Sequence, residues 1–141
     1  MNRLVNRKLA LTIGLATLSA PLLAHHGDAG RFNEITRSVS GTVVAVQLVN
    51  PHSTILFAVV DENGATVTWQ AELGSPKQLS SRFGWNRETL RPGTKITVTG
   101  RPLKSGSPYI NLTERARIVL SDSCEEIYHS TTLPDEPLVC D

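Results

Sequence analysis

The chain has 141 residues, of which 40% are hydrophobic and 19% are charged, and its formal net charge at pH 7 is +1. This near-neutral balance gives no sign of a nucleic acid or an anionic membrane surface as a partner. The length suits one domain of ordinary size that can bury a modest core of its own.

Residues 1–24 have the pattern of a secretory signal peptide. Three basic residues and no acidic one stand at the start, and an almost wholly apolar run follows over residues 9–24. At about 16 residues this run is shorter than the roughly 20 that a membrane-crossing helix needs, and Pro21 interrupts it. We therefore expect cleavage after Ala24, a periplasmic or secreted bacterial protein, and no stable membrane span; a retained anchor is the alternative.

Removal of the leader changes the sign of the net charge. It takes away three of the 14 basic residues, so that 11 remain against 13 acidic ones, a net charge of −2 over 117 residues. Because binding to phosphate groups depends on clustered Lys and Arg, we expect no nucleic-acid partner for the mature chain.

The first half of the mature chain is rich in β-strand signals. Valines spaced by two and three over residues 38–49 predict a first strand, and Gly41 within it predicts a bend. Residues 53–60 and 65–73 predict two further strands, and Asn63-Gly64 between them is typical of a tight hairpin turn.

After residue 73 the spacing of apolar residues changes from that of a strand to that of a helix. Residues 75–84 open with a capping serine and a proline, place two apolar residues four apart, and end on glycine, which predicts a short helix. Further strands are predicted over residues 94–100 and 109–120. The tail, residues 121–141, is predicted to be mostly irregular.

This order of elements predicts the fold. Three strands, one short helix and two strands in about 85 residues match the OB-fold, whose helix lies between strands three and four. Closure requires the bent first strand to pair on both sides. We expect a mainly β protein: an extension over residues 25–37, a five-stranded OB-like Greek-key barrel over residues 38–120, and the tail. An open five-stranded sandwich is the alternative.

Two cysteines, Cys124 and Cys140, lie in the last 18 residues. An exported protein meets an oxidising compartment, where paired thiols persist as disulfides. We expect one disulfide that closes the tail, with a loop of about 15 residues that contributes roughly 3 kcal/mol in the chain-entropy model. The alternative is a redox-active or metal-binding pair.

Histidines suggest a metal site at the mature N-terminus. Cleavage after Ala24 would leave His25 with a free amine, and its amine and ring nitrogen, with His26 and His52, would suit copper or zinc. A soft Cu(I) site is excluded, because the only methionine is Met1 and the cysteines are expected to be bonded. The alternative is that the two terminal histidines are solvated and His52 satisfies a turn.

Three other residues are candidates for a binding site. Glu72 could orient an imidazole, or it could only complement the dipole of the following helix. Trp69 and Trp85 could form an aromatic wall for a ligand, or they could be core residues. His129, near two glutamates in the tail, is interpreted as a surface residue.

Several short motifs occur together in this chain. They are "AHH" at the end of the leader, "NPH", "ELGSP", "GW" and "RPGTKITVTG". Their combination resembles a family of small exported bacterial proteins of unknown function, over about residues 20 to 120. The resemblance implies an OB-like barrel and an exported location, and it brings no established activity. The tail from Ser121 lies outside it.

The sequence contains no motif of a known enzyme class. It has no G-x-S-x-G, no H-E-x-x-H and no phosphate-binding glycine loop, so we expect a protein that is not an enzyme. We predict an exported copper or zinc binding or carrier protein. The alternative is a non-catalytic OB-fold module that binds a small ligand or a partner of the cell envelope.

Overall fold

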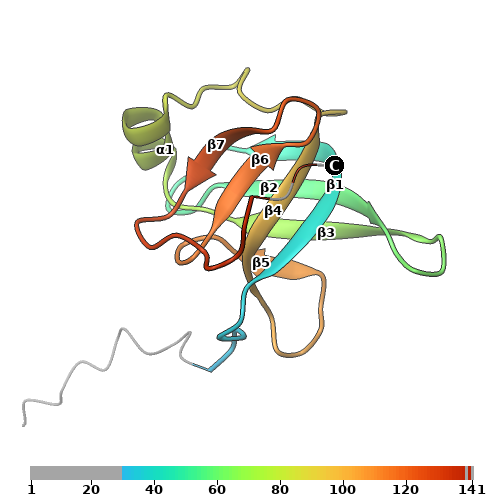
Figure 1. Ribbon diagram of the computed structural model, residues 1–141. Coiled ribbons are helices and arrows are strands. Elements are labelled where there is room, and N and C mark those ends of the chain that lie inside the picture. Colours follow the sequence, from blue (N-terminus) through green and yellow to red (C-terminus); the bar gives the residue numbers. More distant parts are fainter. Residues whose placement is uncertain (1–29, 139, 141) are drawn as a thin grey trace, which may run out of the picture.

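The computed structural model describes residues 30–138 and 140 (Figure 1). The predicted signal peptide and the predicted ligands His25 and His26 lie outside the described residues. The elements follow one another as β1 (Arg37–Gln47), β2 (Thr54–Val60), β3 (Thr66–Glu72), α1 (Pro76–Phe83), β4 (Lys95–Pro102), β5 (Tyr109–Asn111), β6 (Arg117–Leu120) and β7 (Glu125–His129). No helix in the described part of the chain is long and apolar enough to cross a membrane.

Five of the strands form a closed barrel. The strand order is β1-β2-β3-β5-β4, and β4 pairs in turn with β1, which closes the barrel. The β3–β5 pair is parallel and the others are antiparallel. The helix α1 lies between β3 and β4 in the chain. The predicted OB-like barrel with one short helix is thus confirmed, and the open sandwich is excluded.

Closure depends on a bend in β1. Its first half pairs with β4 as far as Thr42, and its second half pairs with β2 from Thr42 onward. Gly41 lies just before this change of partner, and a Cβ atom there would come within 2.5 Å of the Ala58 carbonyl oxygen and 2.8 Å of the Phe57 ring. Only glycine therefore allows the two strands to approach so closely.

A second glycine has the same function in β4. This strand pairs with β6 up to Thr99 and with β5 from Arg101 onward. A Cβ atom on Gly100 would lie 2.6 Å from the Asn111 carbonyl oxygen. The two glycines mark the places where strands pass from one neighbour to the next.

The core fills the barrel and continues under α1. Alternate residues of β4, such as Ile96 and Val98, are fully buried inside the barrel. The helix contributes Leu79, and it is capped as predicted by Ser75 at its start and by Gly84, with φ 69°, at its end. The helix therefore extends the core of the barrel through Leu79.

Tyr128 of β7 completes this part of the core. It is 6% exposed and packs against Phe83 and Trp85, with ring centroids 5.0 and 6.4 Å away. Its hydroxyl donates a hydrogen bond of 2.6 Å to the Leu112 carbonyl oxygen. Burial raises the pKa of the phenol above 10.0, and nearby Arg82 lowers it in part.

One prediction about the C-terminal third is wrong, and another is incomplete. The single strand predicted over residues 109–120 is two strands, because the Asn111 side chain accepts hydrogen bonds from the backbone N–H and hydroxyl of Thr113 and turns the chain. The tail is mostly irregular as predicted, but it contains one strand that was not predicted, β7, which pairs with β6 and extends the sheet beyond the barrel.

The remainder of the tail crosses the outer face of β1 and β4. Glu136 accepts hydrogen bonds from Thr36, at 2.7 Å, and from Ser38, at 3.1 Å. Ser38 is also hydrogen-bonded to Thr99, which is 2% exposed. The predicted disulfide between Cys124 and Cys140 is present, with a Cα–Cα distance of 5.3 Å. It attaches the end of the tail to the turn between β6 and β7.

The close approach at Gly41 predicts that Gly41→Ala destabilises the protein by about 1–3 kcal/mol, because the new methyl group would overpack against Ala58 and Phe57. The measurement is the free energy of unfolding in urea. The exposed neighbour is the control: Thr42→Ala should change stability by less than about 0.5 kcal/mol. Equal stability of Gly41→Ala and the wild type would contradict this account of closure.

The buried phenol predicts a pH dependence. Since the folded-state pKa of Tyr128 is raised, its contribution to stability is present below about pH 10 and is lost as the pH rises through that raised pKa. Tyr128→Phe should lose about 1–2 kcal/mol at neutral pH, because the Leu112 carbonyl loses its donor, and should lose less further stability than the wild type above pH 10. Unfolding free energies at pH 8 and pH 11 test this; parallel losses would contradict it.

Candidate functional site

His52 lies at the start of β2, beside the end of β3. The neighbouring Ser53 fixes this position, because its N–H donates to the Gly74 carbonyl and its carbonyl accepts from the Leu73 N–H, at 3.0 and 2.9 Å. The His52 side chain is half exposed. The backbone pairing therefore holds an accessible imidazole at the edge of the barrel.

The imidazole is connected to two further side chains. His52 Nδ1 lies 3.0 Å from Glu72 Oε1, and the Tyr109 hydroxyl donates a hydrogen bond to Glu72 Oε2. We call His52, Glu72 and Tyr109 the His52 cluster. Both carboxylate oxygens of Glu72 have a partner. Tyr109 therefore holds Glu72 in place, and Glu72 fixes the orientation of the His52 imidazole.

Strand register brings the cluster together. Thr54 pairs with Glu72, which places His52 next to the end of β3. The parallel β3–β5 pairing sets Tyr109 opposite Gln70, two positions before Glu72 and on the same face of the sheet. The cluster thus depends on the parallel pair that helps to close the barrel.

This arrangement determines which nitrogen of His52 is available. A neutral imidazole carries one N–H, and the carboxylate beside Nδ1 favours the proton there. The lone pair is then on Nε2, which is free to bind a metal ion. Histidine ligands of metal ions commonly donate their other N–H to a carboxylate in this way.

The segment before β1 is fixed next to the cluster. The Phe32 ring stacks on the Tyr109 ring with centroids 6.0 Å apart, and Phe32 forms a β-bridge with Leu103. On either side, the Arg31 carbonyl accepts from the Lys104 N–H, at 3.0 Å, and the Asn33 N–H donates to the Pro102 carbonyl, at 2.9 Å. The chain that leads back toward His26 and His25 is therefore attached beside Tyr109.

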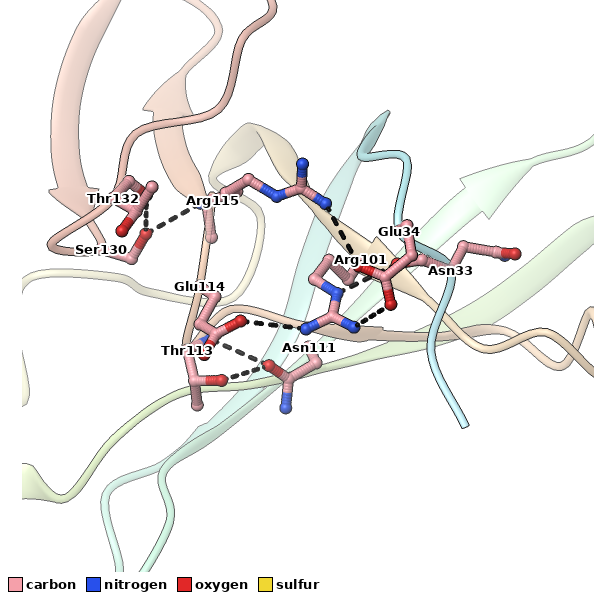
Figure 2. A network of polar contacts seen from close by, with 10 residues as sticks. Asn33, Glu34, Arg101, Asn111, Thr113, Glu114, Arg115, Ser130 and Thr132 are labelled. Atoms are coloured by element: carbon pink, nitrogen blue, oxygen red, sulfur yellow. Dashed lines mark hydrogen bonds and ion pairs between the residues drawn. The ribbon is translucent and has the colours of Figure 1, made fainter. Parts of the chain in front are cut away.

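A polar network strengthens this attachment, as Figure 2 shows. Arg101 donates to the Asn33 carbonyl at 3.0 Å, to Glu34 at 3.2 Å and to Glu114 at 3.0 Å. Arg115 lies 3.9 Å from the same Glu34 carboxylate. The Arg101 side chain is only 16% exposed, whereas the Glu34 and Glu114 side chains are 78% and 67% exposed, so the network lies at the surface. No local sequence pattern marks this network, because Arg101 and Glu34 are 67 residues apart in the chain.

The two tryptophans occupy different environments. Trp85 is 4% exposed, and its indole N–H donates to the Ile127 carbonyl at 2.8 Å, so it is a core residue with little surface for a ligand. Trp69 is half-buried on β3, with the Arg37 guanidinium 5.8 Å from its ring centroid. Of the predicted pair, Trp69 retains accessible surface.

His129 is the other histidine among the described residues, and it is partly exposed as expected. His129 lies on β7, with Nδ1 3.0 Å from Glu126 Oε1, and its side chain is 45% exposed. Among residues 30–138 and 140, no group of three His, Cys, Asp or Glu side chains is arranged to hold a metal ion. Within that range, a metal at His52 would have a single histidine ligand.

Comparison with known proteins gives one match. The model of a family of unknown function, DUF6152, matches residues 12–110. No curated protein and no solved structure matches the chain. The match includes the paired histidines, His52 and the barrel as far as β5, and it leaves out β6, β7 and both cysteines. The chain thus belongs to the DUF6152 family of unknown function.

Proposed function

We propose that this protein is an exported copper or zinc carrier whose metal site combines His52 with His25 and His26 at the mature N-terminus. The observation that carries the proposal is the His52 cluster. His52 Nδ1 is bound to a carboxylate that Tyr109 also holds, and Nε2 is left as a ligand.

The length of the N-terminal segment supports the convergence of these ligands. Phe32, which stacks on Tyr109, follows His26 by six residues. A stretch of six residues can span at most about 20 Å. The cluster lies within that distance of Phe32, since Tyr109 contacts both Phe32 and Glu72. The terminal histidines can therefore reach His52.

The chemistry of the ligands favours Cu(II) or Zn(II). Imidazole and amine nitrogens suit both ions, whereas Cu(I) prefers sulfur. Both cysteines are bonded to each other, and Met1 belongs to the predicted leader. The disulfide also supports an exported location, because such bonds persist in oxidising compartments. We propose a binding role without catalysis, since the sequence contains no enzyme motif.

The proposal predicts about one Cu(II) or Zn(II) per mature chain. Replacing His52 with alanine, or both His25 and His26 with alanine, should remove most of this binding, because each change deletes nitrogen ligands. Metal content and N-terminal mass are measured on untagged protein exported to a periplasm, and affinity is measured by competition with a chelator. His129→Ala is the control, since His129 has the same contact with a glutamate and should not affect binding.

The cluster also predicts a graded effect of the residues behind His52. Glu72→Gln should weaken metal binding about 10- to 100-fold, because the partner of Nδ1 loses its charge. Tyr109→Phe should weaken it less, since Glu72 keeps its contact with His52. Failure of the wild type to take up copper or zinc at micromolar concentrations, or unchanged affinity in His52→Ala, would refute the proposed site.

A further inference from the structure

A groove lies between the second half of β1 and the loop that connects α1 to β4. Its volume is about 480 Å³, within the range typical of small-molecule sites. Aliphatic side chains and two arginines line it: Val44, Ala45, Val46, Leu48, Arg87, Leu90, Arg91 and Pro92. The groove shares none of these residues with the His52 cluster.

The apolar wall of the groove arises from an irregularity in β1. The pairing with β2 shifts between Val43 and Ala45, so Val44 is an extra residue in the strand. A bulge of this kind redirects a side chain, and the Val44 side chain is left 49% exposed. Leu90, at 4% exposure, forms the buried part of the lining. The protein thus presents an apolar surface where a regular strand would have alternated buried and exposed side chains.

The charge at the groove is positive. Arg87 and Arg91 belong to the lining, and no carboxylate does. Arg91 forms an ion pair with the adjacent Glu88. Arg87 is exposed and has no ion pair within the described part of the chain. One guanidinium beside the apolar surface is therefore available to an anionic group.

We propose that this groove binds a long-chain carboxylate, with the alkyl chain against Val44, Val46 and Leu48 and the carboxylate on Arg87. A guanidinium can bind a carboxylate through two parallel hydrogen bonds, which gives preference over a neutral or cationic head group. The alkyl chain would cover the half-exposed Val44 side chain and the accessible parts of the partly buried Val46 and Leu48. This second site is independent of the proposed metal site.

The test is calorimetric titration of the mature protein with dodecanoate, below the concentration at which it forms micelles. We expect one dodecanoate per chain and at least tenfold weaker binding of dodecanol and dodecyltrimethylammonium, which have the same tail and lack the anion. Arg87→Glu should weaken dodecanoate binding about tenfold or more, because a hydrogen bond between charged groups contributes at least that much. Val44→Glu should abolish it.

Two variants serve as matched controls. Lys77→Glu makes the same change of charge on the exposed surface of α1, and Val60→Glu introduces a carboxylate at an apolar position of β2 that is 68% exposed. Both should bind dodecanoate as the wild type does, and thermal unfolding verifies that every variant is folded. Equal affinity for dodecyltrimethylammonium, unchanged affinity in Arg87→Glu, or no binding of dodecanoate would overturn the proposal. Metal uptake should be unchanged in both groove variants.

Discussion

The structure depends on the double pairing of β1. One strand forms hydrogen bonds with β4 along its first half and with β2 along its second half, and the absence of a side chain at Gly41 makes the change of partner possible. If β1 paired on one side only, the sheet would have two exposed edges in place of a closed barrel. Closure also sets the positions of β3 and β5, because they complete the ring opposite β1.

Local signals were sufficient for the first two thirds of the fold. The cap at Ser75, the glycine at the end of α1 and the Asn63-Gly64 turn each act within a few residues, so the sequence reveals them directly. The break after Asn111 and the pairing of β7 were missed. The pairing of β7 depends on contacts with β6, whereas the break after Asn111 comes from a local turn that the apolar pattern over 109–120 does not reveal.

Part of the candidate site was also predictable from signals that are local in the sequence. Glu72 was identified as a possible partner of an imidazole because it lies at the end of the third predicted strand, where the cap of the helix begins. Tyr109 was not identified, since it meets Glu72 across 37 residues through a parallel pairing. Arg101 and Glu34 are 67 residues apart, and no local pattern marks either of them. Contacts of this kind follow from the strand register of the closed barrel and not from the spacing of residues along the sequence.

The hydrogen bonds that Glu136 accepts from Thr36 and Ser38 limit the order in which the chain can fold. Its two hydrogen bonds join residues 100 and 98 positions apart, and the β1–β4 pairing already joins residues more than fifty positions apart. Contacts so distant in sequence slow folding, because long loops must close before these contacts can stabilise the structure. As the chain emerges from its N-terminal end, β1 can pair with β2 soon afterwards, but its pairing with β4 and its contacts with Glu136 need residues made much later. Closure of the barrel therefore waits for β4, and the Glu136 contacts form only when nearly the whole chain is available.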